Sequence, residues 1–361
     1  MIWWTLCSLF KRYDELYLDE TNLLHKHRSK ADIKIAFKIA GGIGDHIIVR
    51  DFINQFCIQM AIDKVDIVLE TRNINASDRF FRKDSFINKI ILEKDLKFKT
   101  YDVVFFIIYQ PIVLKAAYPY LQKYFPKIYN FCVKSNEFNT RYGRFVKNHP
   151  HDDGLFADIM TRKGLNRYSC MAAQGGIYFD RKNILPIYLD NIESAKHIKD
   201  EYITIHDGWD NGLAGALCTK CWSKQNWKEF VGIFKKSFPY IKVVQIGGKF
   251  GGDIAGVDLQ LRDKIPISQS ALILKNSKLH IDGESGLVHL AYHLGVKSIV
   301  LFGPTNKKFF RYPQNINLSA GGCQNCWWSN YDWMFKCPKG RQDCMEKITP
   351  QMVLNSCKEI L

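Results

Sequence analysis

An alternation of short apolar segments, glycine-rich turns and amphipathic segments most constrains how this chain can fold. In the second half, the apolar segment KLHIDG runs into the turn DGESG, and the amphipathic stretch SGLVHLAYHLG follows directly. The same order recurs in EYITIHDG, SKQNWKEFVGIFKKSF, IKVVQIGG, SQSALILKNS and KSIVLFGPT. Strands that alternate with helices predict a parallel sheet with helices on its faces. The second half therefore predicts an α/β unit of the Rossmann type, with Ser223 as the N-cap of its first helix.

The first half begins with the same pattern. A predicted strand at 33–40 precedes the turn GGIGD and the helical stretch HIIVRDFINQFCIQMA, and VDIVLE, INKIILE and YDVVFFIIY predict further strands. HPHDDGLFADIMTRKGLN predicts a loop followed by a helix. We expect two Rossmann-like α/β domains that face each other across a cleft, with ligands at the carboxyl ends of the strands. The predicted parts are an N-terminal domain at 1–190, a C-terminal domain at 191–345 with a four-cysteine tail, and a C-terminal helix at 346–361.

Composition limits the class of protein and the kind of partner. The 361 residues are 47% hydrophobic, enough for sizeable cores, and the net charge is +15. A basic chain indicates a polyanionic partner, which could be nucleic acid, an anionic membrane surface or a phosphorylated substrate. The N-terminal segment MIWWTLCSLFKRY lacks the features of a secretory signal, and no apolar run is long enough to span a bilayer. It could lie in a membrane interface through Trp3, Trp4 and Phe10, or pack on its own domain. We expect a cytoplasmic protein, with peripheral contact to the inner membrane left open.

The glycine turn of the first half contains one candidate catalytic residue. Gly41, Gly42 and Gly44 follow the first predicted strand, and Asp45 stands where a helix N-cap is expected. Glycines here allow close approach of the backbone to a ligand, although a tight strand–helix turn would also need them. The Asp45 carboxylate could cap the helix or project into the cleft as a general base.

The turn DGESG is the strongest candidate for a binding site. It places the backbone N–H groups of Ser285, Gly286 and Leu287 at a helix N-terminus, which favours anions. His289 lies on the first helical turn and is either a site residue or a core histidine, whereas His293 is interpreted as structural. Lys220, next to Thr219, follows a predicted strand and suits a diphosphate, although a surface lysine is the alternative.

Four cysteines near the C-terminus have the spacing of metal ligands. Cys323, Cys326, Cys337 and Cys344 begin with a C-x2-C pair, which indicates a structural zinc or iron site or, alternatively, reduced thiols that pack a loop. The aromatic residues between them are interpreted as core packing rather than as an acceptor surface; they are Trp327, Trp328, Tyr331, Trp333 and Phe335. The solitary cysteines Cys7, Cys57, Cys132 and Cys170 are expected to be buried reduced thiols.

Taken together and in this order, these motifs resemble glycosyltransferase family 9, the bacterial heptosyltransferases of lipopolysaccharide inner-core synthesis. The motifs are GGIGD, TKCW…NWKEF, VVQIGG, DGESGLVHLAYHLGVKSIVLFGPT and the tail CQNC…CPKGRQDC. The resemblance extends over about 202–361, and in the first half only over the first strand, turn and helix. It implies a GT-B fold and an inverting transfer from a nucleotide-sugar donor without a catalytic metal. It also implies that the domain at 1–190 lies on the acceptor side and that the domain at 191–345 binds the nucleotide sugar.

The resemblance also implies roles for individual residues. Asp45 matches the general base, Lys220 matches the lysine on the donor phosphates, and His289 matches a histidine near the donor sugar and phosphate. The implied donor-binding set is Gly41, Gly42, Gly44, Thr219, Lys220, Gly247, Glu284, Ser285, Gly286 and Leu287. Two departures concern the donor: Glu284 stands where the family usually has Asp, and only Asp253 offers an acid after VVQIGG for the ribose.

The implied function is transfer of a heptose or related sugar, with ADP-heptose as the expected donor. The acceptor is a lipopolysaccharide core or another cell-surface glycan, or, as the alternative, an autotransporter or adhesin protein that is O-heptosylated. Family members that glycosylate autotransporters hold iron at a comparable cysteine cluster. From a different class, a basic nucleic-acid-binding protein with a four-cysteine metal knuckle would also have this charge, but no basic run interleaves with aromatic residues. A third hypothesis is a family member without activity. The presence of Asp45, Lys220 and His289 argues against it.

Overall fold

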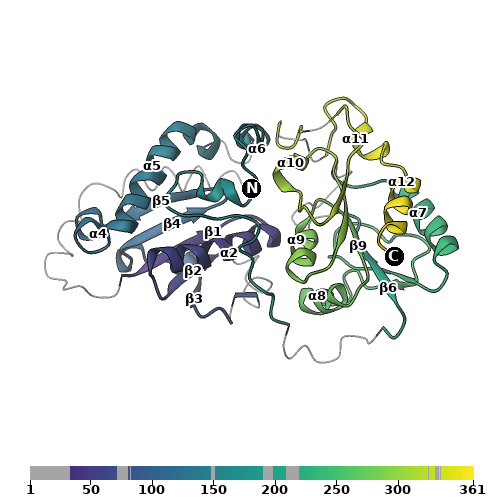
Figure 1. Ribbon diagram of the computed structural model, residues 1–361, viewed down its shortest axis with the longest axis horizontal. Coiled ribbons are helices and arrows are strands. Elements are labelled where there is room, and N and C mark those ends of the chain that lie inside the picture. The colour runs from purple at the N-terminus through teal and green to yellow at the C-terminus, as the bar shows by residue number, and fades with distance from the viewer. Residues whose placement is uncertain are drawn as a thin grey trace. The chain divides into compact units, whose positions relative to one another are not determined.

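The computed structural model describes residues 33–70, 80–81, 83–147, 151–189, 198–208, 219–323, 325–329, 333 and 335–361 (Figure 1). The N-terminal amphipathic segment, Cys7 and Tyr331 lie outside the described residues. Contacts between Cα atoms divide the chain into two compact units. The first unit contains Met1–Gly41, Val49–His149 and Tyr168–Asn183, and the second contains Gly42–Ile48, Pro150–Arg167 and Ile184–Leu361. The predicted domain limits at 190 and 345 stay a prediction.

The first unit is built on a mixed sheet. Among the described residues its strands are β1 (Ile35–Ile39), β2 (Val65–Leu69), β3 (Ile87–Leu92), β4 (Val103–Ile107) and β5 (Pro111–Ala116). Their order is β3-β2-β1-β4-β5, with β5 antiparallel to β4 and the other pairs parallel. The first four strands confirm the sequence prediction. The antiparallel edge strand β5 was not predicted.

Helices and aromatic side chains cover this sheet. The helices are α2 (Ile43–Met60), α4 (Tyr118–Tyr124) and α5 (Pro126–Lys147), and short 3-10 turns lie at Glu93–Asp95, Phe98–Thr100 and Ser169–Ala172. Phe37 and Phe105 stack on neighbouring strands at a centroid distance of 5.0 Å. Phe56 of α2 and Phe131 of α5 pack edge-on against Phe105 and against each other. These contacts place α2 and α5 on the same face of the sheet. Helix α5 was not predicted from the sequence.

The second unit is built on a parallel sheet. Among the described residues its strands are β6 (Tyr202–Ile205), β7 (Lys242–Gln245), β8 (Leu259–Gln260), β9 (His280–Gly283), β10 (Ser298–Leu301) and β11 (Ile316–Leu318). Their order is β11-β10-β9-β6-β7-β8, and every neighbouring pair is parallel. The predicted Rossmann-type unit is thereby confirmed. The carboxyl ends of β6 and β9, which pair directly, meet at the centre of one sheet edge.

The helices of the second unit include those predicted at 223–238, 268–277 and 285–295, and the one predicted within 149–166, which we expected in the N-terminal domain. They are α6 (Asp153–Arg162), α7 (Lys224–Ser237), α8 (Ile267–Lys275), α9 (Gly286–His293), α10 (Lys307–Phe310), α11 (Asp343–Glu346) and α12 (Pro350–Lys358). The predicted cap is confirmed, since Ser223 Oγ accepts a hydrogen bond from the Asn226 N–H at 3.2 Å. Trp222, Trp227 and Phe230 pack with residues of α12 in one buried core, and Trp222 Nε1 donates to the Ile348 carbonyl at 2.8 Å.

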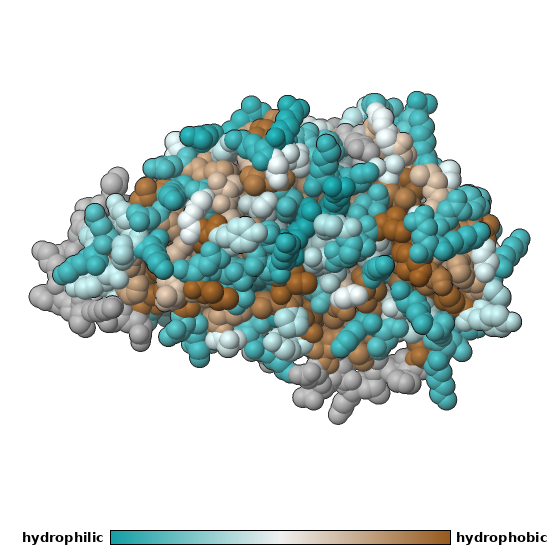
Figure 2. All heavy atoms as spheres, in the orientation of Figure 1, coloured by the Kyte–Doolittle hydropathy of each residue, from teal (hydrophilic) through white to brown (hydrophobic). Residues whose placement is uncertain are grey.

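Polar and apolar residues are mixed over the surface. Figure 2 shows hydrophilic residues spread over both units on the face drawn, between smaller apolar areas. Among the helices of the described residues, none is both long enough and apolar enough to cross a membrane.

Candidate active site

The N-terminus of α9 lies directly after the end of β9. Ser285 has extended backbone angles and caps the helix, because its Oγ accepts a hydrogen bond from the Leu287 N–H at 3.2 Å. The Ser285 hydroxyl in turn donates to the carboxylate of Asp282, the third residue of β9. The turn is therefore held from the strand below it. The Val288 N–H bonds to the Ser285 carbonyl at 3.2 Å, and the helix dipole favours an anion at this end of α9.

A largely buried ion pair lies beside this helix end. Lys220 Nζ is 2.8 Å from Glu284 Oε2, and His289 Nε2 is 3.8 Å from Glu284 Oε1. Burial alone would raise the pKa of Glu284, but the Lys220 ammonium and His289 outweigh it and hold that pKa at about 2. His289 Nδ1 also lies 2.6 Å from the Tyr312 hydroxyl, which fixes the imidazole ring. Lys220, Glu284 and His289, all predicted from the sequence, therefore form one cluster.

A second buried network supports the turn from below. The Asp282 carboxylate lies 2.9 Å from His206 Nδ1 and 3.3 Å from His280 Nε2, and Thr204 Oγ1 is 3.0 Å from His280 Nδ1. Burial would raise the pKa of Asp282, but His206 and His280 lower it to about 2. Sequence analysis did not single out these residues. The sequence contained one indication of this network. His280 and Asp282 are two residues apart on a predicted strand, so their side chains lie on the same face of β9, which pairs with β6.

The first turn of α2 also belongs to the second unit and contains Asp45. The helix begins at Ile43, so Asp45 is the third helical residue and not the N-cap that we expected. Its Oδ2 accepts a hydrogen bond from the Gly42 N–H at 3.1 Å, the backbone half of a capping box. Its Oδ1 accepts one from Arg167 Nη2 at 2.8 Å, and the Arg167 side chain is buried. Arg167 is the cation that positions Asp45. No sequence motif identified Arg167 as a site residue.

Two glycines bring Asp45 close to α9. A Cβ on Gly44 would lie 2.3 Å from His289 Cδ2 and 3.2 Å from the Cα of Gly286. A Cβ on Gly286 would lie 2.5 Å from Ile43 Cγ2. Real Cβ atoms cannot approach this closely, so both positions require glycine. The structure thus brings together Asp45, the N-terminus of α9 and the cluster around Glu284.

Other predicted site residues have structural partners. The buried Thr219 hydroxyl donates to the Trp333 carbonyl at 2.7 Å. Gly247 has a φ of +146°, and a Cβ there would lie 2.7 Å from His206 Cδ2, so Gly247 borders the network of Asp282. Gly41 has a φ of +99°, which favours glycine in the turn before α2. Asp253 pairs with Arg262 at 2.8 Å. His293 Nδ1 lies 2.7 Å from the His289 carbonyl, in agreement with a structural role.

The four C-terminal cysteines influence one another electrostatically. Burial, together with the nearby thiols Cys323, Cys326 and Cys337, raises the pKa of Cys344 to about 12. Thiolates are the ligands that iron and zinc prefer, so the donor set suits either metal. Among the described residues, however, no three His, Cys, Asp or Glu side chains are close enough to hold an ion.

Trp327 and Trp333 are buried, as expected, but Phe335 is exposed. Cys57, Cys132 and Cys170 are buried thiols that form no disulfide with a described residue, which confirms the prediction.

Comparison with known families identifies the segment that contains this site. Residues 213–332 match the family model described as glycosyltransferase family 9 (heptosyltransferase). Over this range the chain is similar to glycosyltransferase family 9. The match includes Lys220, Glu284 and His289, whereas Asp45 precedes the matched range. No curated protein matches the chain.

Solved structures of similar fold belong to the same class of enzyme. The iron-containing dodecameric glycosyltransferase TibC from enterotoxigenic E. coli H10407 has a TM-score of 0.59 at 14% identity, over 91% of this chain and 80% of that one. The family 9 glycosyltransferase of Veillonella parvula DSM 2008 has a TM-score of 0.55 at 15% identity, over 92% and 99%. E. coli ADP-heptose lipopolysaccharide heptosyltransferase II has a TM-score of 0.54 at 12% identity, over 91% and 98%. The predicted GT-B class and the predicted enzyme class, a glycosyltransferase, are confirmed.

Proposed function

We propose that the chain transfers a heptose, or a closely related sugar, from ADP-heptose to a lipopolysaccharide core or another cell-surface glycan, with inversion at the anomeric carbon. The family 9 domain supports the class of sugar. TibC, which has a similar fold, was solved in complex with ADP-D-beta-D-heptose. The observation that carries the proposal is the contact of Gly44 with Gly286 and His289, because it sets a carboxylate beside an anion-binding helix end.

In this proposal the N-terminus of α9 and Lys220 hold the diphosphate of the donor. The Lys220 ammonium forms an ion pair with Glu284 in the structure. When the donor binds, the same ammonium would also interact with the donor phosphates. His289, whose ring is held by Tyr312, lies where the first helical turn meets Glu284 and would contact the sugar or its phosphate. Charge that develops on the leaving diphosphate is then stabilised by groups already in place.

Asp45 serves as the general base of the proposed transfer. Its carboxylate takes the proton of the acceptor hydroxyl while the acceptor oxygen attacks the anomeric carbon from the face opposite the nucleotide. The bond between that carbon and the diphosphate oxygen breaks, and its electron pair leaves with the nucleoside diphosphate. Arg167 and the Gly42 N–H fix the orientation of the carboxylate for this step.

The four-cysteine segment would hold a structural iron or zinc ion. Cys323, Cys326, Cys337 and Cys344 are the candidate ligands, and four thiolates leave no open position for substrate. TibC is described as iron-containing, which supports iron as one candidate. We also place the protein at the cytoplasmic face of the inner membrane, because a net charge of +15 favours an anionic lipid surface.

The experiment that tests the function combines nucleotide binding with transfer. We expect calorimetric titration to show saturable binding of ADP and weaker binding of UDP, GDP and CMP. Asp45→Asn should lower transfer from ADP-heptose about a hundredfold or more and leave ADP affinity unchanged. The exposed control Asp63→Asn should retain transfer. Turnover of Asp45→Asn within tenfold of wild type would exclude Asp45 as the base, and absence of nucleotide binding would overturn the proposed function.

A further inference from the structure

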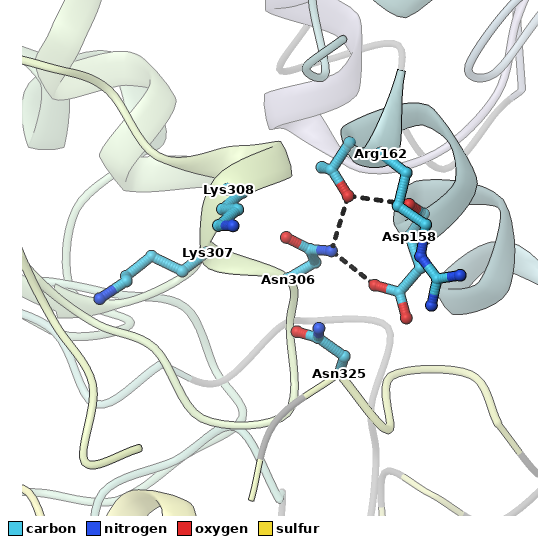
Figure 3. A pocket seen from close by; sticks show the side chains of 7 residues that line it. Asp158, Arg162, Asn306, Lys307, Lys308 and Asn325 are labelled. Carbon is cyan, nitrogen blue, oxygen red and sulfur yellow. Dashed lines mark hydrogen bonds between the residues drawn. The ribbon is translucent and has the colours of Figure 1, made fainter. Parts of the chain in front are cut away.

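A pocket of about 360 Å³ lies between α6 and α10 in the second unit (Figure 3). Helix α6 supplies Asp158, Thr161 and Arg162, and the start of α10 supplies Asn306, Lys307 and Lys308. Asn325, from the four-cysteine segment, completes the lining. None of these residues belongs to the cluster around Glu284 or to the proposed transfer. The volume falls in the range of small-ligand sites.

One wall of the pocket is rigid and polar. Asp158, Thr161 and Arg162 lie three and four residues apart and therefore share a face of α6. Figure 3 shows the Asn306 side chain directed toward Asp158 of α6. Asn306 Nδ2 donates to Asp158 Oδ1 at 2.6 Å and lies 3.4 Å from Thr161 Oγ1. The Asn306 Oδ1 accepts from the Phe309 N–H at 3.0 Å, so this buried amide is held on both sides. The positions of the lining groups are thus set by the protein and do not depend on a ligand.

The pocket has an excess of positive charge. It contains three basic side chains and one carboxylate. Within the part of the chain that the structure describes, Lys307 Nζ bonds to one neutral group, the Ser319 hydroxyl, at 2.7 Å. Arg162 and Lys308 are exposed, and within the described part of the chain neither forms an ion pair with a carboxylate. A guanidinium and an ammonium without carboxylate partners at one pocket favour a phosphate or a carboxylate as ligand.

The pocket also contains acceptors that an inorganic anion could not satisfy. Asn325 Oδ1 is buried and has no hydrogen-bond partner among the described residues. Asn325 has a φ of +64°, a conformation that few residues other than glycine adopt readily. A buried acceptor without a donor costs stability, and a ligand hydroxyl would remove that cost. The second oxygen of Asp158 is a further acceptor for hydroxyl groups and would repel a bare polyanion.

From these groups we infer that the pocket binds a sugar that carries a phosphate or a carboxylate substituent. The anionic substituent lies against Arg162 and Lys308, and the sugar hydroxyls donate to Asn325 Oδ1 and Asp158. The chain continues from α6 to Arg167, whose N–H donates to the Phe309 carbonyl at 2.9 Å and whose side chain bonds to Asp45. The ligand therefore contacts the same segment that positions the proposed base. This binding does not require that the chain transfers a heptose.

The test is calorimetric titration of the full-length protein with glucose 6-phosphate, glucuronate, glucose and inorganic phosphate. We expect saturable binding of glucose 6-phosphate, glucuronate or both, and none of glucose at the same concentrations. The double variant Arg162→Gln/Lys308→Gln should bind at least about tenfold more weakly, because it removes both cations that face the anionic substituent in this proposal. The control Lys275→Gln, an exposed lysine at the end of α8, should bind as wild type does.

A second variant separates the sugar from the anion. Asn325→Gly keeps the backbone conformation and removes the amide, so it should weaken binding of the acidic sugar and leave inorganic phosphate unaffected. The proposal is overturned if no acidic sugar binds, if the double variant binds as wild type does, or if inorganic phosphate binds as tightly as glucose 6-phosphate. ADP titration of the same variants is a separate readout. If ADP did not bind, that result would count against the proposed function and not against the proposed ligand of this pocket.

Discussion

At the scale of single residues, the site depends on charges that are buried together with their partners. Glu284 is held ionised by Lys220 and His289, and Asp282 by His206 and His280. Removal of one member of such a group leaves the others desolvated and unpaired, which costs more than the original interaction contributes. These residues therefore couple the stability of the second unit to pH.

Glu284→Gln tests this coupling. At pH 7 we expect a loss of about 1–3 kcal/mol, because Lys220 loses the carboxylate that compensates it. The pKa of Glu284 is lowered from 4.5 to about 2, so its contribution is complete above pH 4.5 and is lost as the pH falls toward 2. The difference in melting temperature between wild type and variant should thus shrink between pH 5 and pH 3. Glu229→Gln, at an exposed position of α7, should change neither value. A difference that is independent of pH would contradict the assignment of charge to Glu284.

At the scale of elements, the decisive contact is the approach of the first turn of α2 to the first turn of α9. Both helices carry a glycine at the contact, Gly44 and Gly286, and neither position has room for a methyl group. His289 cannot easily yield, since its ring is held by Tyr312. The contact brings two N-terminal turns together, so the position of Asp45 relative to His289 depends on it.

Gly44→Ala should separate these two helix ends. We expect a loss of stability of about 1–3 kcal/mol from overpacking, together with a large fall in transfer. The matched control is Gly143→Ala in α5, where a Cβ meets no atom within 4 Å. Alanine in a helix is intrinsically favoured over glycine by up to about 1 kcal/mol, so the control should be neutral or stabilising. Equal melting temperatures for the two variants would show that the helix ends are not in contact.

At the scale of the whole molecule, the four-cysteine segment is integrated into the second unit. Cys344 and Met345 belong to its buried core, and a Cβ on Gly303 would lie 2.4 Å from Met345 Sδ. The Trp333 carbonyl accepts the hydroxyl of Thr219, next to the proposed phosphate-binding lysine. A metal ion on the thiols would therefore stabilise the same unit that contains the proposed donor site.

Metal analysis of the purified protein tests this arrangement. We expect about one iron or zinc ion per chain, and its loss in Cys326→Ser/Cys337→Ser with a melting temperature several degrees lower. Cys57→Ala, which changes a buried thiol of the first unit, should keep the metal. A metal-free wild type with unchanged stability after the double substitution would favour packed, reduced thiols.

The sequence by itself determined the local elements of this protein and most of the residues at its candidate site. Periodicity and glycine turns sufficed for β6, β7, β9, β10 and the helices between them, because a strand, its turn and the next helix are specified by neighbouring residues. The cluster of Lys220, Glu284 and His289 was predicted through its motifs.

Tertiary structure alone decided the partners of these residues. Arg167 lies far along the chain from Asp45, the asparagine and lysines of α10 meet α6, and α2 begins three residues earlier than the pattern indicated. Such contacts depend on packing between segments that are distant in the sequence. The hydrophobic periodicity of one segment does not predict which buried charges will pair with one another.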